Sequence, residues 1–154
     1  MATQTSGIKR IVVGLDGSDQ AAAALNWAIR MAAGMGSEIT AVYGINIPVY
    51  FPEPSLPIQF DETWRAEIRA EFENEWCKPL KVSGLPYHAL MEDGRPASVI
   101  AAVAEREDAH IIVVGRRGRG GVTELLLGSV GHELVLHSKR PILLISREKS
   151  NVSE

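Results

Sequence analysis

The amino-acid sequence predicts an α/β protein built around a parallel sheet, and three observations support this class. Four runs are continuously apolar and rich in β-branched residues, as strands covered by helices on both faces are. Segments with helical periodicity separate these runs, and this alternation is typical of βαβ units. The chain of 154 residues has the size of a single domain with one hydrophobic core.

The four apolar runs are the predicted central strands, and they comprise residues 11–15, 39–43, 111–114 and 141–146. None of them alternates between apolar and polar residues, so both faces of each strand are expected to be buried. A weaker candidate, residues 87–92, would form a fifth and less buried strand.

The first helix is predicted between the first two strands. Apolar residues recur there at spacings of three, four and three, which marks one face of a helix. The inward-facing residues would be Ala22, Leu25, Ile29 and Ala32. Ser18 stands where an N-cap is expected, because its hydroxyl can accept a hydrogen bond from a first-turn N–H group.

Residues 61–78 are predicted to form one amphipathic helix with an acidic outer face. Four apolar side chains recur there at every fourth position among six carboxylates and three basic side chains. These apolar residues, expected in the core, are Trp64, Ile68, Phe72 and Trp76.

A further helix is predicted to open at Gly94-Arg95-Pro96. Pro96 suits the first helical turn, where the N–H group that proline lacks has no partner within the helix. Its inward-facing residues would be Val99, Ile100 and Val103. The last helix is expected over residues 128–137. The segment 47–57 contains four prolines, which preclude a regular helix or a central strand, so we expect a long loop there.

Composition and charge exclude several classes of protein. The 16 basic and 19 acidic residues give a net charge of −3, which argues against nucleic-acid binding by the molecule as a whole. The single cysteine, Cys77, cannot form an internal disulfide. No apolar run approaches the length that spans a bilayer, and residues 1–7 lack the features of a secretory signal. We therefore expect a cytoplasmic protein that binds no membrane.

A glycine-dense segment follows the strand at 111–114. It begins at Gly115 and ends at Gly128-Ser129, the start of the last predicted helix. Glycine lets backbone N–H groups approach an anion, and the N-terminus of a helix also favours phosphate. Three cations, Arg116, Arg117 and Arg119, lie in the same loop. A phosphate site is one interpretation, and a tight turn with a solvated basic loop is the other.

The end of the first strand supports the phosphate interpretation by its position. Ligands of open α/β sheets bind outside the carboxyl ends of the strands. Asp16 follows the first strand, where its carboxylate could accept hydrogen bonds from a ribose or face a metal-bound phosphate. An Asx turn or a helix cap is the alternative role for this residue.

These residues resemble the ATP-binding branch of the universal stress protein (UspA) family. The resemblance rests on the spacing Gly115-x2-Gly118-x9-Gly128-Ser129 and on the first strand ending in Val-Gly-Leu-Asp-Gly-Ser. The sequence Gly94-Arg-Pro-Ala before the third helix fits the same family. The resemblance covers residues 8–147.

The resemblance implies a Rossmann-like fold of the adenine nucleotide alpha hydrolase type. Its open sheet of five parallel strands would have the order 3-2-1-4-5, with two helices on each face. The domain would span residues 8–147, between flexible ends at 1–7 and 148–154. A homodimer would form through the last strand, Pro141 to Ser146.

The resemblance also implies a ligand, ATP, and the residues that would hold it. The positions at the nucleoside would be Gly14, Asp16 and, at the adenine through its backbone, Gly44. Those around the ribose and phosphates would be Val114, Gly115, Gly118, Arg119, Gly128, Ser129 and Val130. Mg²⁺ would be held through ATP, with Asp16 facing it. Gly44 departs from the family, which often has an apolar side chain there.

We expect no enzymatic activity beyond slow, incidental ATP hydrolysis. The chain lacks a P-loop, a Ser-Gly-Gly-x-Asp-Ser loop and a His-x-Gly-His pair. Its histidines show no metal-binding spacing, and acidic neighbours are expected to raise the pKa of the Cys77 thiol. The sequence therefore predicts an ATP-binding protein with a regulatory role in the stress response. Two alternatives remain, a dimeric interaction module that binds no nucleotide and a cyclic-nucleotide sink.

Overall fold

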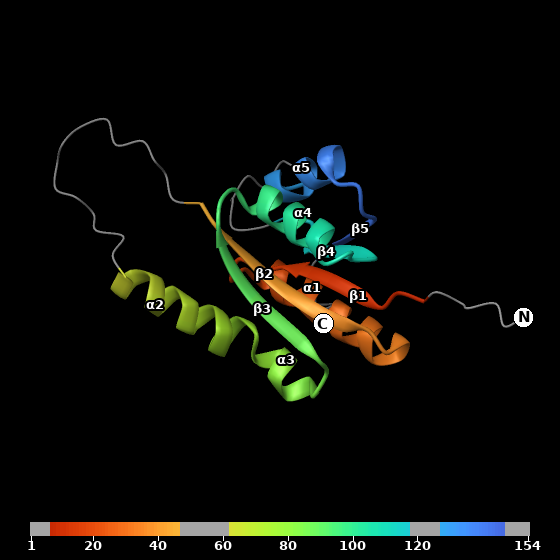
Figure 1. Cartoon of the computed structure of the whole chain (residues 1–154), viewed down its shortest axis with the longest axis horizontal. Helices are drawn as coiled ribbons and strands as arrows, with labels where there is room; N and C mark the ends of the chain where they lie inside the picture. Colours follow the sequence, from red (N-terminus) through yellow and green to blue (C-terminus); the bar gives the residue numbers. More distant parts are fainter. Residues whose placement is uncertain (1–6, 47–61, 118–126, 147–154) are drawn as a thin grey trace, which may run out of the picture.

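The computed structural model describes residues 7–46, 62–117 and 127–146 and contains a five-stranded sheet (Figure 1). The strand order is β3-β2-β1-β4-β5, and every pairing is parallel. The strands are β1 (Arg10–Gly14), β2 (Glu38–Ile45), β3 (Tyr87–Asp93), β4 (Ile111–Gly115) and β5 (Ile142–Ile145). This topology confirms the predicted fold class and strand order.

Helices cover both faces of the sheet (Figure 1). One hydrophobic cluster joins the sheet to α1 (Asp19–Met35), to the π-helical turn η1 (Phe72–Trp76), which continues α2 (Glu62–Glu71), and to α3 (Lys78–Ser83). A second cluster joins the opposite face to α4 (Pro96–Arg106) and α5 (Ser129–His137). Strand β1 explains the continuous apolar pattern, because Ile11 and Val13 face the first cluster and Val12 faces the second.

The proline-rich loop expected at 47–57 lies outside the described residues, as do the expected terminal tails except Gly7. In the part of the chain that the structure describes, no helix has the length and apolar character to cross a membrane.

Helix α1 begins as predicted, and Leu25 and Ala32 are buried as predicted. The rest of its buried face is shifted by one position along the sequence. The Ser18 hydroxyl accepts a hydrogen bond from the Ala21 N–H group at 3.1 Å, which confirms the N-cap. The prediction for Ala22 is wrong, because it is exposed, and Ile29 is only half-buried. A stripe with spacings of three and four fits two adjacent helix faces equally well, and packing selects the one with Ala21, Ala24, Leu25, Ala28 and Ala32.

The prediction of a single regular helix over residues 61–78 is wrong, because three consecutive helical elements of different geometry cover this range. Helix α2 passes into the π-helical turn η1, where the Cys77 N–H group donates to the Phe72 carbonyl five residues earlier, and α3 follows. Of the four expected core residues, only Phe72 is fully buried, and Trp64, Ile68 and Trp76 are half-buried. Phe72 and Trp76 both contact the ring of Tyr43.

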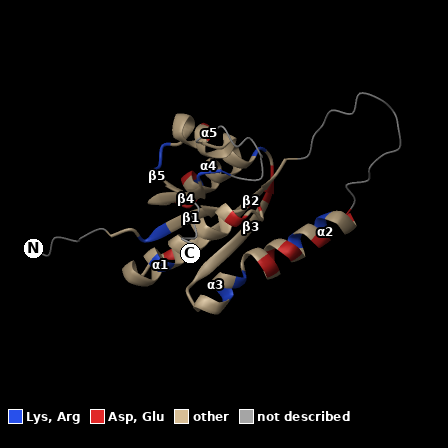
Figure 2. Ribbon diagram, turned by 180° about the vertical axis from the view of Figure 1, so that it is seen from behind, with Lys and Arg blue, Asp and Glu red and all other residues tan. Residues whose placement is uncertain are grey.

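Helix α2 lies at the edge of the molecule, beside β3, which explains why its apolar residues are less buried than predicted (Figure 1). A bidentate ion pair joins Arg65 of α2 to Asp93 at the end of β3, with nitrogen to oxygen distances of 2.8 and 2.9 Å. The acidic outer face is present, because Glu62, Glu67 and Glu71 are exposed along the helix (Figure 2).

The first turn of α4 packs closely against β2 at Gly44. A Cβ atom at this position would lie 2.8 Å from the Cα atom of Pro96 and 3.3 Å from Cβ of Val99. The distance to Pro96 is too short for a side chain, and this neighbour is backbone, which cannot rotate away, while the distance to Val99 would be a tight contact. Gly44 therefore sets how closely α4 approaches the sheet.

Gly44→Ala is expected to lower the free energy of unfolding by about 1–3 kcal/mol, because the new methyl group overpacks the contact with Pro96. Gly34→Ala serves as the control, since Gly34 lies in α1 with open space around it. That change is expected to raise the free energy of unfolding by up to about 1 kcal/mol through helix propensity. Urea denaturation measures both, and equal effects would contradict the packing role of Gly44.

Candidate functional site

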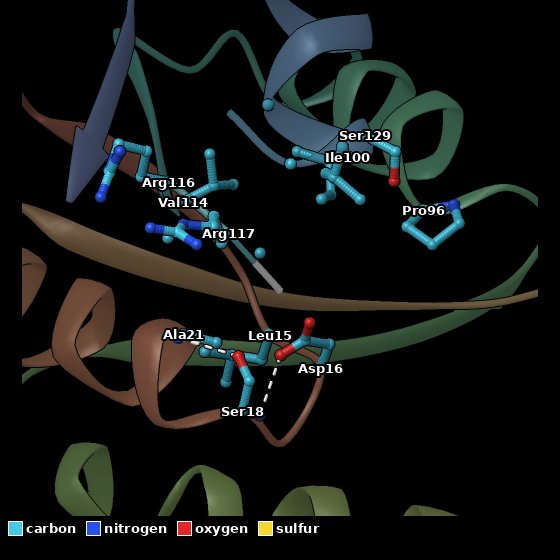
Figure 3. A pocket seen from close by; sticks show the side chains of 15 residues that line it. Leu15, Asp16, Ser18, Ala21, Pro96, Ile100, Val114, Arg116, Arg117 and Ser129 are labelled. Carbon is cyan, nitrogen blue, oxygen red and sulfur yellow. Dashed lines mark hydrogen bonds between the residues drawn. The ribbon is translucent and has the colours of Figure 1, made fainter. Parts of the chain in front are cut away.

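A cavity lies at the carboxyl ends of β1 and β4 and encloses about 550 Å³, including space open to solvent (Figure 3). The strand order reverses here, because β1 pairs with β2 on one side and with β4 on the other. Ligands of open parallel sheets bind at such a reversal point. The cavity thus has the position of a ligand site.

Most of the residues predicted for the nucleotide site meet at this cavity. Those that line it are Gly14, Asp16, Val114, Gly115, Gly128, Ser129 and Val130. They come from two segments that are far apart in the sequence. One is the end of β1 with the loop after it, and the other comprises the end of β4, Gly128 and the first turn of α5. Gly44 is not among the lining residues and instead contacts α4. Gly118 and Arg119 lie outside the described residues.

Sequence reasoning missed the wall that α4 contributes. Pro96 and Ile100 line the cavity on its α4 side, facing the β1 loop that carries Leu15 and Asp16 (Figure 3). The sequence correctly indicated that Ile100 faces inward, but not that it reaches the strand ends. The position of Pro96 at the helix start was the available signal, because a helix that follows a parallel strand begins near the ligand edge of the sheet.

The loop after β1 is held by its own polar side chains. The Asp16 Oδ1 atom accepts a hydrogen bond from the Ser18 N–H group at 2.9 Å, and Ser18 in turn caps α1 (Figure 3). The Asx-turn interpretation of Asp16 is therefore confirmed. The carboxylate is half-buried and also lines the cavity, so this turn orients it toward the space between the two loops.

Hydrogen bonds bring together the two ends of the glycine-dense segment. The Arg116 N–H group donates to the Ile145 carbonyl of β5, and the Gly128 N–H group donates to the Arg116 carbonyl, both at 2.8 Å. Helix α5 begins directly after Gly128, which has no side chain to cap it. The first-turn residues Ser129 and Val130 line the cavity, so this end of α5, with its partial positive charge, lies at the site.

Two guanidinium side chains add positive charge to the same region. Arg116 and Arg117 both line the cavity, and they extend from the end of β4 beside Val114 (Figure 3). The part of the lining that the structure describes contains a single carboxylate, that of Asp16. Among the described residues, the cavity therefore combines a cationic side, an apolar wall on α4 and one carboxylate.

In the described part of the chain, the histidines and the cysteine do not form a second site. In residues 7–46, 62–117 and 127–146, no group of three or more His, Cys, Asp or Glu side chains could hold a metal ion. The His110 Nδ1 atom accepts a hydrogen bond from the Arg10 N–H group at 3.3 Å, at the amino ends of the strands, whereas the cavity lies at their carboxyl ends. Cys77 is fully buried, and burial, with a smaller contribution from the Glu73 carboxylate, raises the pKa of its thiol to about 11.

The universal stress protein family model matches residues 7–146, so the chain belongs to the universal stress protein family. The universal stress protein MJ0531 of Methanocaldococcus jannaschii is 31% identical over 145 residues, which cover 92% of this chain and 84% of that relative. This membership confirms the family that the glycine spacing and the end of the first strand predicted.

Solved structures agree with the fold. The universal stress protein UspA of Lactobacillus plantarum superposes with a TM-score of 0.76 at 24% identity, covering 90% of this chain and 97% of that one. A universal stress protein described as a complex with cAMP gives a TM-score of 0.69 at 26% identity, covering 93% of this chain and 100% of that one.

Cys77 is expected to resist thiol reagents in the folded protein, because it is buried and its thiolate forms only near pH 11. Labelling with a disulfide reagent at pH 8 measures this, and unfolding in urea should accelerate labelling by at least about a hundredfold. The unfolded thiol ionises at lower pH, so stability is expected to fall as pH rises from about 9 to 11. Fast labelling of the native protein would contradict this assignment.

Proposed function

We propose that the chain binds an adenine nucleotide, ATP, in the cavity between β1, β4 and the start of α5. The observation that carries the proposal is the first turn of α5, which has no side-chain cap among the described residues and lines the cavity through Ser129 and Val130. Its N–H groups are suited to phosphate oxygens, and the Ser129 hydroxyl can donate one further hydrogen bond.

The rest of the lining supports a nucleoside with charged phosphates. Pro96 and Ile100 offer an apolar surface for a base, while Arg116 and Arg117 supply positive charge for an anion. Asp16, already oriented by the Ser18 N–H group, offers its remaining oxygen to a ribose hydroxyl. The relative described as a complex with cAMP supports an adenine ligand in this family.

Mg²⁺ would accompany ATP rather than occupy a site of its own. One carboxylate, Asp16, lines the described cavity, and Mg²⁺ prefers six oxygen ligands. The donor set therefore fits a metal whose remaining ligands are phosphate oxygens and water. Asp16 would face the metal in place of the ribose hydroxyl, and the metal would neutralise phosphate charge.

We propose that the protein has a binding role in the regulation of the stress response, with ATP hydrolysis at most slow and incidental. Among the described residues, the cavity lining contains no histidine, cysteine or lysine that could serve as a nucleophile or a general base. A cyclic-nucleotide sink would use the same cavity, and the cAMP complex of the relative favours this second candidate. The relative affinities of ATP, AMP and cAMP distinguish the two.

Ser129→Asp is expected to weaken ATP binding at least about tenfold, because the carboxylate repels phosphate at close range. The effect should be smaller for AMP, and adenosine should bind within about twofold of the parent. The helix itself should not be weakened, since an acidic residue is favourable in a first turn. Isothermal titration with the three ligands measures the series.

Val82→Asp is the matched control, because it makes the same change in net charge on an exposed α3 residue with 79% exposure, away from the cavity. It should bind all three ligands like the parent. Equal ATP affinity in both aspartate variants would refute a phosphate site at α5. A parent protein that binds no nucleotide, and releases none on heat denaturation, would favour the interaction module instead.

We also propose a homodimer through the last strand, residues 141–146. Strand β5 is an edge of the sheet, and Val135 and Leu136 of the adjoining helix α5 are exposed at 55% and 62%. The Pro141 carbonyl accepts a hydrogen bond from Ile112 of β4. Because the next N–H group across a trans peptide points the other way, the Ile142 amide faces the open edge.

Ile142→Pro is expected to convert the dimer to a monomer, because it removes an edge N–H group without removing a hydrogen bond to β4. Ile142→Ala shortens the same side chain but keeps the N–H group, and it should remain dimeric. Light scattering after size exclusion gives the mass of each, and circular dichroism verifies folding. A folded Ile142→Pro dimer would exclude pairing through this edge.

A further inference from the structure

Gln20, in the first turn of α1, contacts the start of the glycine-dense segment from outside the cavity. Its Oε1 atom accepts a hydrogen bond from the Arg117 N–H group at 2.7 Å, across 97 positions of the sequence. Gln20 is half-buried and does not line the cavity. Its side chain therefore affects the cavity indirectly, through the backbone of residue 117.

The backbone of α1 lies against the same segment. A Cβ atom at Gly115 would lie 2.9 Å from the Gln20 carbonyl carbon and 3.0 Å from its Cβ atom. The first turn of α1 is itself fixed by the Ser18 cap. Gln20 thus extends from a rigid turn that is already in contact with the end of β4.

Three hydrogen bonds then determine how the chain leaves β4. The Arg116 N–H group is bound to β5, the Arg116 carbonyl is bound to Gly128, and the Arg117 N–H group is bound to Gln20. The first two are backbone contacts that any sequence could make. The third depends on the side chain of Gln20, so a substitution there can change the loop without altering the sheet.

We propose that Gln20 is a positioning residue: it holds the backbone of residues 115–117, the start of the glycine-dense segment, in the conformation that phosphate binding requires. This inference rests on the proposed nucleotide function. Because Gln20 occupies the Arg117 N–H group, that amide points toward α1 and leaves the phosphates to other donors, among them the first turn of α5. Loss of the contact frees the chain after Arg116, while Arg116 itself stays bound to Ile145 and Gly128, and this lowers the affinity for ligands that carry phosphates.

The test compares Gln20→Met with the parent, because methionine has similar length and helix propensity but no strong acceptor. ATP affinity should fall about threefold to tenfold, the effect expected of one neutral hydrogen bond. Adenosine affinity should change less than twofold, because adenosine has no phosphate. A purely structural defect would lower both affinities together and would overturn the inference.

Hydrogen exchange at single amides gives the direct measurement. The Arg117 amide should exchange faster in Gln20→Met, whereas the Arg116 amide, bound to Ile145, should keep its protection and serves as the internal control. Gln20→Glu keeps an acceptor of the same length and should restore protection at Arg117.

The two proposals fail in different ways. If the parent binds ATP and Gln20→Met has the same ratio of ATP to adenosine affinity, the role of Gln20 is refuted while the nucleotide function stands. If the parent binds no ATP, the nucleotide function is refuted and the inference falls with it.

Discussion

Strand β1 is buried on both faces and paired on both edges, and the position of the site depends on this constraint. From β1 the chain continues to β2 and β3 on one side of β1, and it then crosses back to form β4 and β5 on the other side. Helix α1 therefore covers one face, and α4 and α5 cover the other. The loops that leave β1 and β4 separate toward opposite faces, and the crevice between them is the cavity.

The charge of the molecule is divided between two regions. Glutamates occupy the exposed side of α2, at the edge beside β3, whereas Arg116 and Arg117 line the cavity (Figure 2). An acidic chain with a net charge of −3 can thus present a cationic site, because the field near a bound anion depends mainly on the closest charges. The partial charge at the start of α5 has the same sign.

Local signals predicted much of the fold and of the site. The four apolar runs gave β1, β2, β4 and β5 within a few residues, and the weaker candidate at 87–92 gave β3. Ser18 and Pro96 marked helix starts correctly. These signals act through neighbouring atoms, so the sequence carries them directly. The burial predicted for Ala22 and for three of the four apolar residues of 61–78 was wrong, because periodicity shows that a helix has an apolar face but not which neighbour covers it. Helix α2 lies at the edge, where little covers it.

The sequence by itself determined the α/β class, the edge of the sheet where ligands bind, and most of the residues there, because strand burial and glycine spacing are local properties. Only the tertiary structure decided that Ile100 forms a wall of the cavity, that Gly44 contacts Pro96, and that Gln20 binds the Arg117 amide. Each of these contacts joins segments distant in the sequence. Their distances depend on how helices pack on a twisted sheet, and no local pattern encodes that packing.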